Sequence, residues 1–119
     1  MRGRGRSRRS PVAESALRWA SPALKALKAM PNPVRETVSF ALVQARMGLT
    51  HLKAKPMKGL GPGVFEVALT HKGDAYRLIY TTRVEGVVFV AHCFVKKSTS
   101  GIKTPKHIID AAEQRLKNF

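Results

Sequence analysis

Residues 65–95, FEVALTHKGDAYRLIYTTRVEGVVFVAHCFV, decide the fold of this chain. Apolar side chains occupy alternate positions in the first two segments of this stretch: Phe65, Val67 and Leu69, then Tyr76, Leu78 and Tyr80. A period of two is typical of a half-buried strand, and the nearly continuous apolar run at 87–95 is typical of a strand buried on both faces. The segments 71–74 and 83–86 have hairpin lengths. The stretch therefore predicts three antiparallel strands, with the third the most buried.

Two helices are predicted before this sheet from their start and stop signals. Ser21-Pro22 places a Ser before a Pro at the first helical position, and Pro31 ends this helix. Asn32-Pro33 repeats the signal, and apolar residues then recur at three- and four-residue spacing until Gly48. The pair predicts an antiparallel helical hairpin. Residues 12–20 satisfy neither period, so a short strand and a helical lead-in both stay open.

A last helix is predicted after a polar loop at 98–103. Thr104-Pro105 opens it, and one face carries Ile108, Ala111, Ala112 and Leu116. The order predicts an α+β domain: two N-terminal helices packed on a small curved antiparallel sheet, plus a C-terminal helix, with one sheet face left available. The 119 residues fit one domain, with 1–10 as a disordered basic tail and 11–119 as the folded unit.

The chain is strongly basic. It has 22 Lys and Arg against 7 Asp and Glu, a formal charge of +15, and removing the five arginines of the tail still leaves +10. Such a domain repels itself, and a polyanion would neutralise it by releasing condensed counterions. Nucleic acid is the leading partner, ahead of an acidic protein or an anionic membrane. The tail either holds phosphate nonspecifically or is a vector remnant or an early start codon.

Several other classes of function find no support in the sequence. No apolar run approaches the roughly 18 to 20 residues of a membrane span, and no secretory signal follows the Arg-rich start, so we expect a soluble, cytoplasmic protein. Cys93 is alone, which favours a small buried apolar residue over a reactive thiol. Scattered carboxylates and four separated histidines predict no metal site. Residues 59–63 are predicted to form a tight turn, and we expect no cofactor.

Basic residues cluster around the strand segment, with aromatic residues among them. The candidate nucleic-acid contacts are Lys55, Lys58, Lys96, Lys103 and Lys106 for phosphates and Phe94, Tyr76 or Tyr80 for stacking an unpaired base. For any single lysine a solvated surface is the more ordinary explanation. The whole set favours nucleic-acid binding.

Two residues carry the strongest indication of chemistry. Arg77 is a permanent charge within an apolar strand, so it must face solvent, clamp a phosphate, or pair with Glu66 across the hairpin. RNA can be cut without metal by a base, an acid and a cation that stabilises the phosphorane. His92 is either that base or acid or a satisfied core histidine. His107 is predicted to be an exposed helix residue, and the remaining histidines fall in loops.

A family resemblance enters through several separated motifs in one order. These are Lys55-Pro-Met-Lys-Gly-Leu-Gly-Pro-Gly-Val-Phe-Glu66, Ala75-Tyr-Arg-Leu-Ile-Tyr80, His92-Cys-Phe-Val-Lys-Lys-Ser98, Thr104-Pro105 and the last helix with Arg115. Together, over about residues 19–117, they resemble the HigB-like, phage-associated branch of the RelE/ParE toxins of type II toxin–antitoxin systems.

The resemblance implies a metal-independent, ribosome-dependent endoribonuclease that cleaves mRNA in the ribosomal A site and is silenced by a helix-turn-helix antitoxin encoded beside it. It assigns Arg77 to phosphate stabilisation, and it adds Lys97, which closes the third strand beside Lys96, to the catalytic set of Arg77 and His92. RelE itself has two lysines where this chain has Glu66 and Ala68, so the lysine acid–base scheme of RelE does not transfer. The alternatives are a ParE-like inhibitor of DNA gyrase and a catalytically inactive phage RNA-binding protein.

Overall fold

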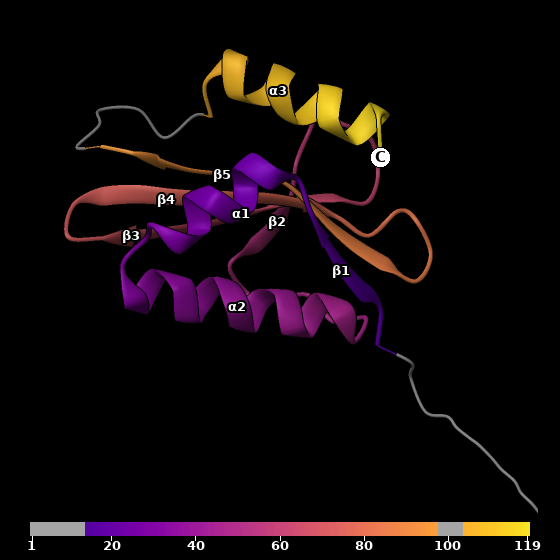
Figure 1. Ribbon diagram of the computed structural model, residues 1–119, viewed down its shortest axis with the longest axis horizontal. Helices are drawn as coiled ribbons and strands as arrows, with labels where there is room; N and C mark the ends of the chain where they lie inside the picture. Colours follow the sequence, from indigo (N-terminus) through magenta and orange to yellow (C-terminus); the bar gives the residue numbers. More distant parts are fainter. Residues whose placement is uncertain (1–13, 98–103) are drawn as a thin grey trace, which may run out of the picture.

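The computed structural model describes residues 14–97 and 104–119 (Figure 1). Along the chain the elements are β1 (Ala16–Trp19), α1 (Ser21–Lys28), α2 (Asn32–Arg46), β2 (Ala54–Pro56), β3 (Val64–His71), β4 (Asp74–Thr81), β5 (Val87–Lys96) and α3 (Lys106–Lys117). The predicted tail at 1–10 and the predicted loop at 98–103 lie outside the described residues.

The sheet has five strands in the order β1-β5-β4-β3-β2. Its three central strands pair antiparallel, as predicted. The expectation that the third of them is the most buried is wrong, because five of the eight residues of β4 are buried against five of ten in β5. The whole sheet is mixed, because β1 pairs parallel with β5 from Ala16 opposite Val87 to Trp19 opposite Val90. The segment 12–20 thus contains a short edge strand. The other edge, β2, was not predicted, since three residues are too few to show a period.

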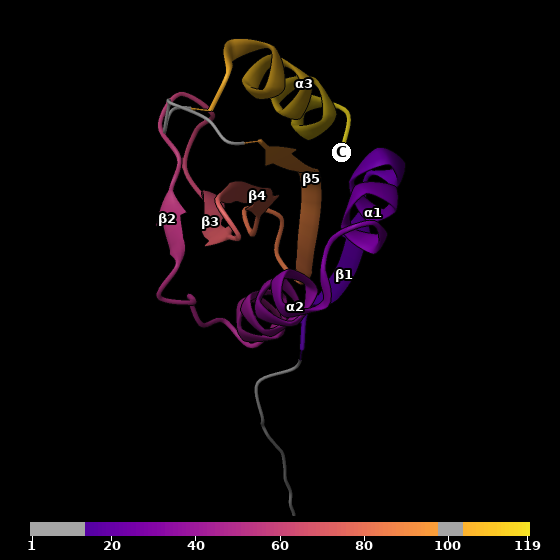
Figure 2. The ribbon, with the colours of Figure 1, turned by 90° about the vertical axis from the view of Figure 1, so that its left-hand side faces the viewer.

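Helices cover both faces of the sheet. On one face α1 and α2 enclose a core that includes Leu27, Val38 and Leu78. On the other face α3 packs Ala112 and Leu116 against a second cluster, and Figure 2 shows α3 and α2 on opposite sides of the strands. The expectation that one face stays available is therefore wrong where α3 lies. The physical reason is that the central strands are apolar on both faces.

The second cluster is built from both elements. Its buried sheet residues are Val64, Ile79, Phe89 and Ala91. Beyond the end of α3, the ring of Phe119 stacks on Phe89 with 4.1 Å between the ring centroids. These contacts fix α3 over Ile79 of β4 and over Phe89 and Ala91 of β5.

The glycine-rich turn before β3 was predicted and is confirmed. Gly63 has φ +78°, and a Cβ there would lie 2.9 Å from the Cβ of Arg83, so only glycine fits. The Gly63 carbonyl accepts a hydrogen bond from Thr81 Oγ1 at 2.7 Å. This contact fixes the start of β3 against the end of β4. No helix in the described parts of the chain is long and apolar enough to cross a membrane.

Candidate functional site

The strand register brings the chemically active side chains to one face of the sheet. Glu66 lies opposite Ile79, and Ile79 lies opposite His92; in the next row Arg77 lies opposite Phe94. Residues directly opposite each other share a face, and neighbouring strands are about 4.8 Å apart. Glu66, Arg77, His92 and Phe94 therefore lie together on the face toward α3.

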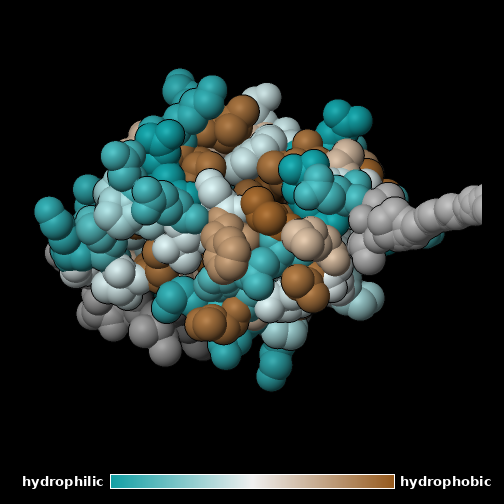
Figure 3. Space-filling view, turned by 90° about the horizontal axis from the view of Figure 1, so that it is seen from below, coloured by the Kyte–Doolittle hydropathy of each residue, from teal (hydrophilic) through white to brown (hydrophobic). Residues whose placement is uncertain are grey.

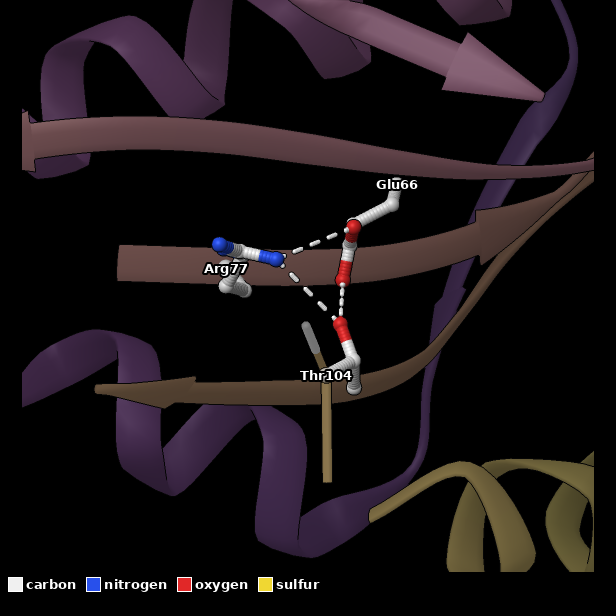
Figure 4. Close-up of polar contacts among 3 residues, drawn as sticks. All are labelled: Glu66, Arg77 and Thr104. Atoms are coloured by element: carbon white, nitrogen blue, oxygen red, sulfur yellow. Dashed lines mark hydrogen bonds and ion pairs between the residues drawn. The ribbon is translucent and has the colours of Figure 1, made fainter. Parts of the chain in front are cut away.

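Arg77 is the centre of a compact polar cluster (Figure 4). Its Nη1 donates to Glu66 Oε1 and to Thr104 Oγ1, each at 3.3 Å. Thr104 Oγ1 in turn donates to Glu66 Oε2 at 2.5 Å. The side chains of Arg77 and Glu66 are only 12% and 17% exposed. The pairing with Glu66 that the sequence left open is thus the arrangement in this structure.

Thr104 links this cluster to the last helix. It lies two residues before the first residue of α3, and its hydroxyl bridges the carboxylate and the guanidinium. The start of α3 is therefore tied to β3 and β4 through one side chain. Sequence reasoning placed Thr104 only as a helix start signal, because nothing in the sequence pairs it with Glu66.

His92 lies beside this cluster and is half-buried. Its ring contacts Phe94 edge to face, with 5.5 Å between the centroids. Its Nδ1 is enclosed and has no hydrogen-bond partner among the residues that the structure describes. Most buried polar atoms in proteins have such a partner, so the Nδ1 of His92 departs from the usual arrangement of a core histidine.

Burial and a neighbouring cation lower the pKa of His92. Burial has the largest effect and the charge of Arg115 the next, the Cys93 backbone opposes them, and His107 adds the smallest decrease. Arg115 Nη1 donates to the Ala91 carbonyl at 2.8 Å, which fixes the guanidinium next to His92. The imidazole is therefore neutral at neutral pH. Arg115 was not predicted as a site residue, although its place beside Leu116 on the apolar face of α3 was visible in the sequence.

The structure separates Lys97 from this site. Lys97 lies just beyond the last residue of β5, and its side chain is 76% exposed. Lys97 lies 3.9 Å from Asp74 Oδ2 and lines a hollow with Met30, Tyr76 and Cys93 on the α1 side. Its placement in the catalytic set stays a prediction, and in this structure Lys97 lies beside Asp74 rather than in the Arg77 cluster.

The two predicted stacking tyrosines are also on the other face. Tyr80 is 1% exposed, and its ring stacks on Phe65 with 5.4 Å between the ring centroids. The Tyr80 ring could therefore stack on a base only if the core opened. Tyr76 is 7% exposed in the same core. Phe94 remains the one aromatic residue of the predicted set on the Arg77 face, and it is half-buried.

The predicted basic contacts are spread around the Arg77 face. Lys55 lies opposite Glu66 on the edge strand, and Lys96 lies opposite Ala75 one row beyond Phe94. Lys58 is exposed, and Lys106 is exposed and paired with Asp110 at 3.0 Å. Lys103 lies outside the described residues. Among the residues that the structure does describe, no three His, Cys, Asp or Glu side chains gather in a way that could hold a metal ion.

Comparisons with known proteins agree with this architecture. Residues 25–117 match the family model described as "Phage derived protein Gp49-like (DUF891)". No curated protein matches the chain. Among solved structures, a free mutant form of E. coli toxin RelE is similar at TM-score 0.60 and 24% identity, covering 87% of this chain and 98% of that one.

Two further structures are similar at slightly higher identity. Isolated E. coli RelE toxin has TM-score 0.55 and 26% identity, covering 86% of this chain and 98% of that chain. A chain of the intact E. coli RelBE toxin–antitoxin complex has TM-score 0.54 and 28% identity, and the match covers 71% of this chain and 98% of that chain. This chain belongs to the Gp49-like family of phage-derived proteins and, by its fold, to the RelE/ParE superfamily of toxins.

Proposed function

We propose that this chain is the toxin of a type II toxin–antitoxin system, of the HigB-like branch, and that it acts in the cytoplasm as a ribosome-dependent mRNA endoribonuclease. The superfamily membership supports the toxin class. The formal charge of +15 and the lysines around the Arg77 face support a polyanionic substrate. The observation that carries the nuclease activity is Arg77 on one face with His92, beside an aromatic ring.

Arg77 stabilises the phosphate in this proposal. Its guanidinium already binds a carboxylate, and a carboxylate and a phosphate present the same kind of paired oxygens. RNA would replace Glu66 as the partner of Arg77 and place the scissile phosphate between Arg77 and His92. Charge that develops on the phosphate in the transition state is then met by a cation in a mostly enclosed site.

His92 accepts the proton of the RNA 2′-hydroxyl while the 2′-oxygen bonds to phosphorus. The bond between phosphorus and the 5′-oxygen breaks, and the leaving 5′-oxygen takes a proton from water. Burial together with Arg115 and His107 lowers the pKa of His92, so the ring is in its neutral, proton-accepting form. The proton gained would create an imidazolium beside the cationic Arg115, and the negative phosphate would offset that repulsion. Phe94 would stack the neighbouring base, while Lys55, Lys58, Lys96 and Lys106 would contact flanking phosphates.

The partners follow from the same proposal. The substrate is mRNA in the ribosomal A site, and the inhibitor is a helix-turn-helix antitoxin. The E. coli relative in the RelBE structure is held in a complex with its antitoxin, which supports a protein inhibitor of this general kind.

One observation favours the second candidate, a ParE-like inhibitor of DNA gyrase that does not cut RNA. The Arg77 side chain is 12% exposed and engaged by Glu66 and Thr104, as a purely structural arginine would be. Under this alternative the cluster only fixes α3 to the sheet. Toxicity would then not depend on Arg77 beyond its effect on folding.

The experiment that separates the two is a toxicity assay on Arg77 variants in bacteria. Arg77→Ala should reduce killing by two or more orders of magnitude, because one transition-state cation typically contributes about 10²–10³ in rate. Arg18→Ala, which removes an exposed arginine from β1, should keep toxicity. Because Arg77→Ala leaves Glu66 unpaired, the double variant Arg77→Ala/Glu66→Gln is tested with it. A folded double variant with full toxicity would contradict the nuclease assignment.

A further inference from the structure

An exposed apolar surface covers the outer side of α2 and the segment that follows it. We call it the α2 apolar patch; its members and exposed fractions are Phe40 (57%), Val43 (44%), Met47 (46%), Leu49 (53%) and Leu52 (79%). These are five of the eight large apolar residues that are exposed in the described parts of the chain. Figure 3 shows apolar groups gathered in the centre of this face.

The patch does not arise from an unfinished core. The opposite side of α2 is already buried, with Val34, Val38, Ala41, Leu42 and Ala45 in contact with the sheet side of the molecule. Phe40, Val43 and Met47 recur at three- and four-residue spacing, so they form one stripe along the outer side. The helix is therefore apolar on both sides.

The segment after α2 extends the stripe into a surface. The His51 ring packs edge to face on Phe40, with 5.6 Å between the centroids, and is itself 8% exposed. This contact holds residues 49–52 against the helix, so that Leu49 and Leu52 stand beside the stripe. Large contiguous apolar surfaces of this kind on soluble proteins mark contact sites.

The shape and charge of the surroundings indicate what covers the patch. The stripe from Phe40 to Met47 is about 10 Å long at 1.5 Å per residue, which matches two turns of a partner helix. Arg46 and Lys53 adjoin Met47 and Leu52 of the patch in sequence, and Arg46 also lies 3.7 Å from Glu14 Oε1. A second copy would bring two bodies of formal charge +15 together, whereas an acidic partner would be attracted.

We infer that the α2 apolar patch docks an amphipathic helix of the antitoxin, with apolar residues toward α2 and acidic residues toward Arg46 and Lys53. This inference rests on the proposed toxin function. The patch lies on the α2 side of the sheet, while Arg77 lies on the α3 side. A helix at the patch therefore anchors the antitoxin without covering Arg77. It increases the affinity of the antitoxin for this chain but does not block the Arg77 face.

The test is calorimetric titration of the full chain with the purified protein encoded immediately beside its gene. Phe40→Ser and Met47→Ser should each weaken binding about tenfold or more, as truncated apolar anchors at interfaces do. The matched control is Val95→Ser, which removes an exposed valine of β5 that lies beside α1, away from the patch, and should change affinity less than twofold. Higher salt should weaken binding of the wild-type chain, since it screens the acidic flank.

Toxicity of the free variants separates this inference from the proposed function. Phe40→Ser and Met47→Ser should kill as the wild-type chain does, because neither residue belongs to the Arg77 face. Unchanged affinity in both variants would overturn the patch while leaving the toxin proposal intact. If the wild-type chain does not bind the neighbouring protein, that protein is not its antitoxin, and both the patch inference and the proposed antitoxin partner are contradicted. A wild-type dimer that the patch variants disperse would assign the surface to a second copy and also overturn the inference.

Discussion

At the scale of single residues, the site depends on a guanidinium and a carboxylate that hold each other in a mostly enclosed place. Arg77 and Glu66 are 12% and 17% exposed, and Thr104 bridges them. Removing one charge from an enclosed pair costs more than the pair itself contributes, because the other charge stays without compensation. In the proposed mechanism, Glu66 thus holds Arg77 in the position where a phosphate would replace the carboxylate.

Glu66→Gln should lower the free energy of unfolding by about 1–3 kcal/mol, since Arg77 loses its compensating charge while the shape is kept. Chemical denaturation measures this change. The matched control is Asp110→Asn, which removes the carboxylate of an exposed pair with Lys106 and should cost less than about 0.5 kcal/mol. Equal effects of the two substitutions would show that the Arg77 cluster contributes no more than a surface pair.

Arg115→Gln should raise the pKa of His92 toward its usual value, because the substitution removes a cation that opposes imidazolium formation. Burial remains, so the pKa should stay below the ordinary value. NMR titration of the imidazole resonances measures it, and Arg18→Gln serves as a distant control. An unchanged pKa in Arg115→Gln would contradict the electrostatic role of Arg115.

The same pKa predicts how stability depends on pH. Because the pKa of His92 is lowered in the folded chain, the unfolded chain takes up the proton first as the pH falls below about 6.5. The contribution of His92 to stability is therefore present above that pH and is lost as the pH falls toward the lower, folded-state pKa. His92→Gln should flatten this part of the stability profile measured by denaturation at pH 5 to 8. An identical slope in both proteins would disprove it.

At the scale of elements, the spacing of apolar residues predicted the long helices and strands but not the short edge strands. The helices from Ser21 and Asn32, the three central strands and the last helix all have enough residues to show a period. β1 and β2 have four and three residues, and their pairing depends on distant partners in β5 and β3. Such short edge strands are set by tertiary contacts rather than by local pattern.

The same alternation explains which site residues were predictable. Tyr80 follows Arg77 by three positions, so the period of two already assigns them to opposite faces, and its selection for stacking went against the pattern. Lys97 was taken from the resemblance, and it lies just beyond β5 beside Asp74. The contacts of Thr104 and Arg115 could not be predicted, because they depend on where α3 packs.

Leu116→Ala should lower the free energy of unfolding by about 2–5 kcal/mol, as large-to-small changes in a core do. Leu116 is 5% exposed where α3 meets the sheet. The matched control is Leu52→Ala, at a leucine that is 79% exposed, which should change stability by less than about 0.5 kcal/mol. If both variants unfold alike, α3 does not pack on the second cluster as described.

At the scale of the whole molecule, two surfaces with different chemistry lie on opposite sides of the sheet. The Arg77 face carries cations and a half-buried aromatic ring suited to RNA, and the α2 apolar patch is suited to a protein. The formal charge of +15 attracts both a nucleic acid and an acidic inhibitor. If both proposals hold, the inhibitor and the RNA bind on opposite sides of the sheet.

The most direct test of the nuclease proposal is mapping of RNA 5′ ends by primer extension after brief induction in bacteria. Translated and untranslated copies of one transcript are compared in cells making the wild-type chain or the Arg77→Ala/Glu66→Gln variant. We predict new ends confined to the translated copy and absent with the variant. Growth arrest by the wild-type chain without new ends would contradict the nuclease account and favour inhibition of gyrase.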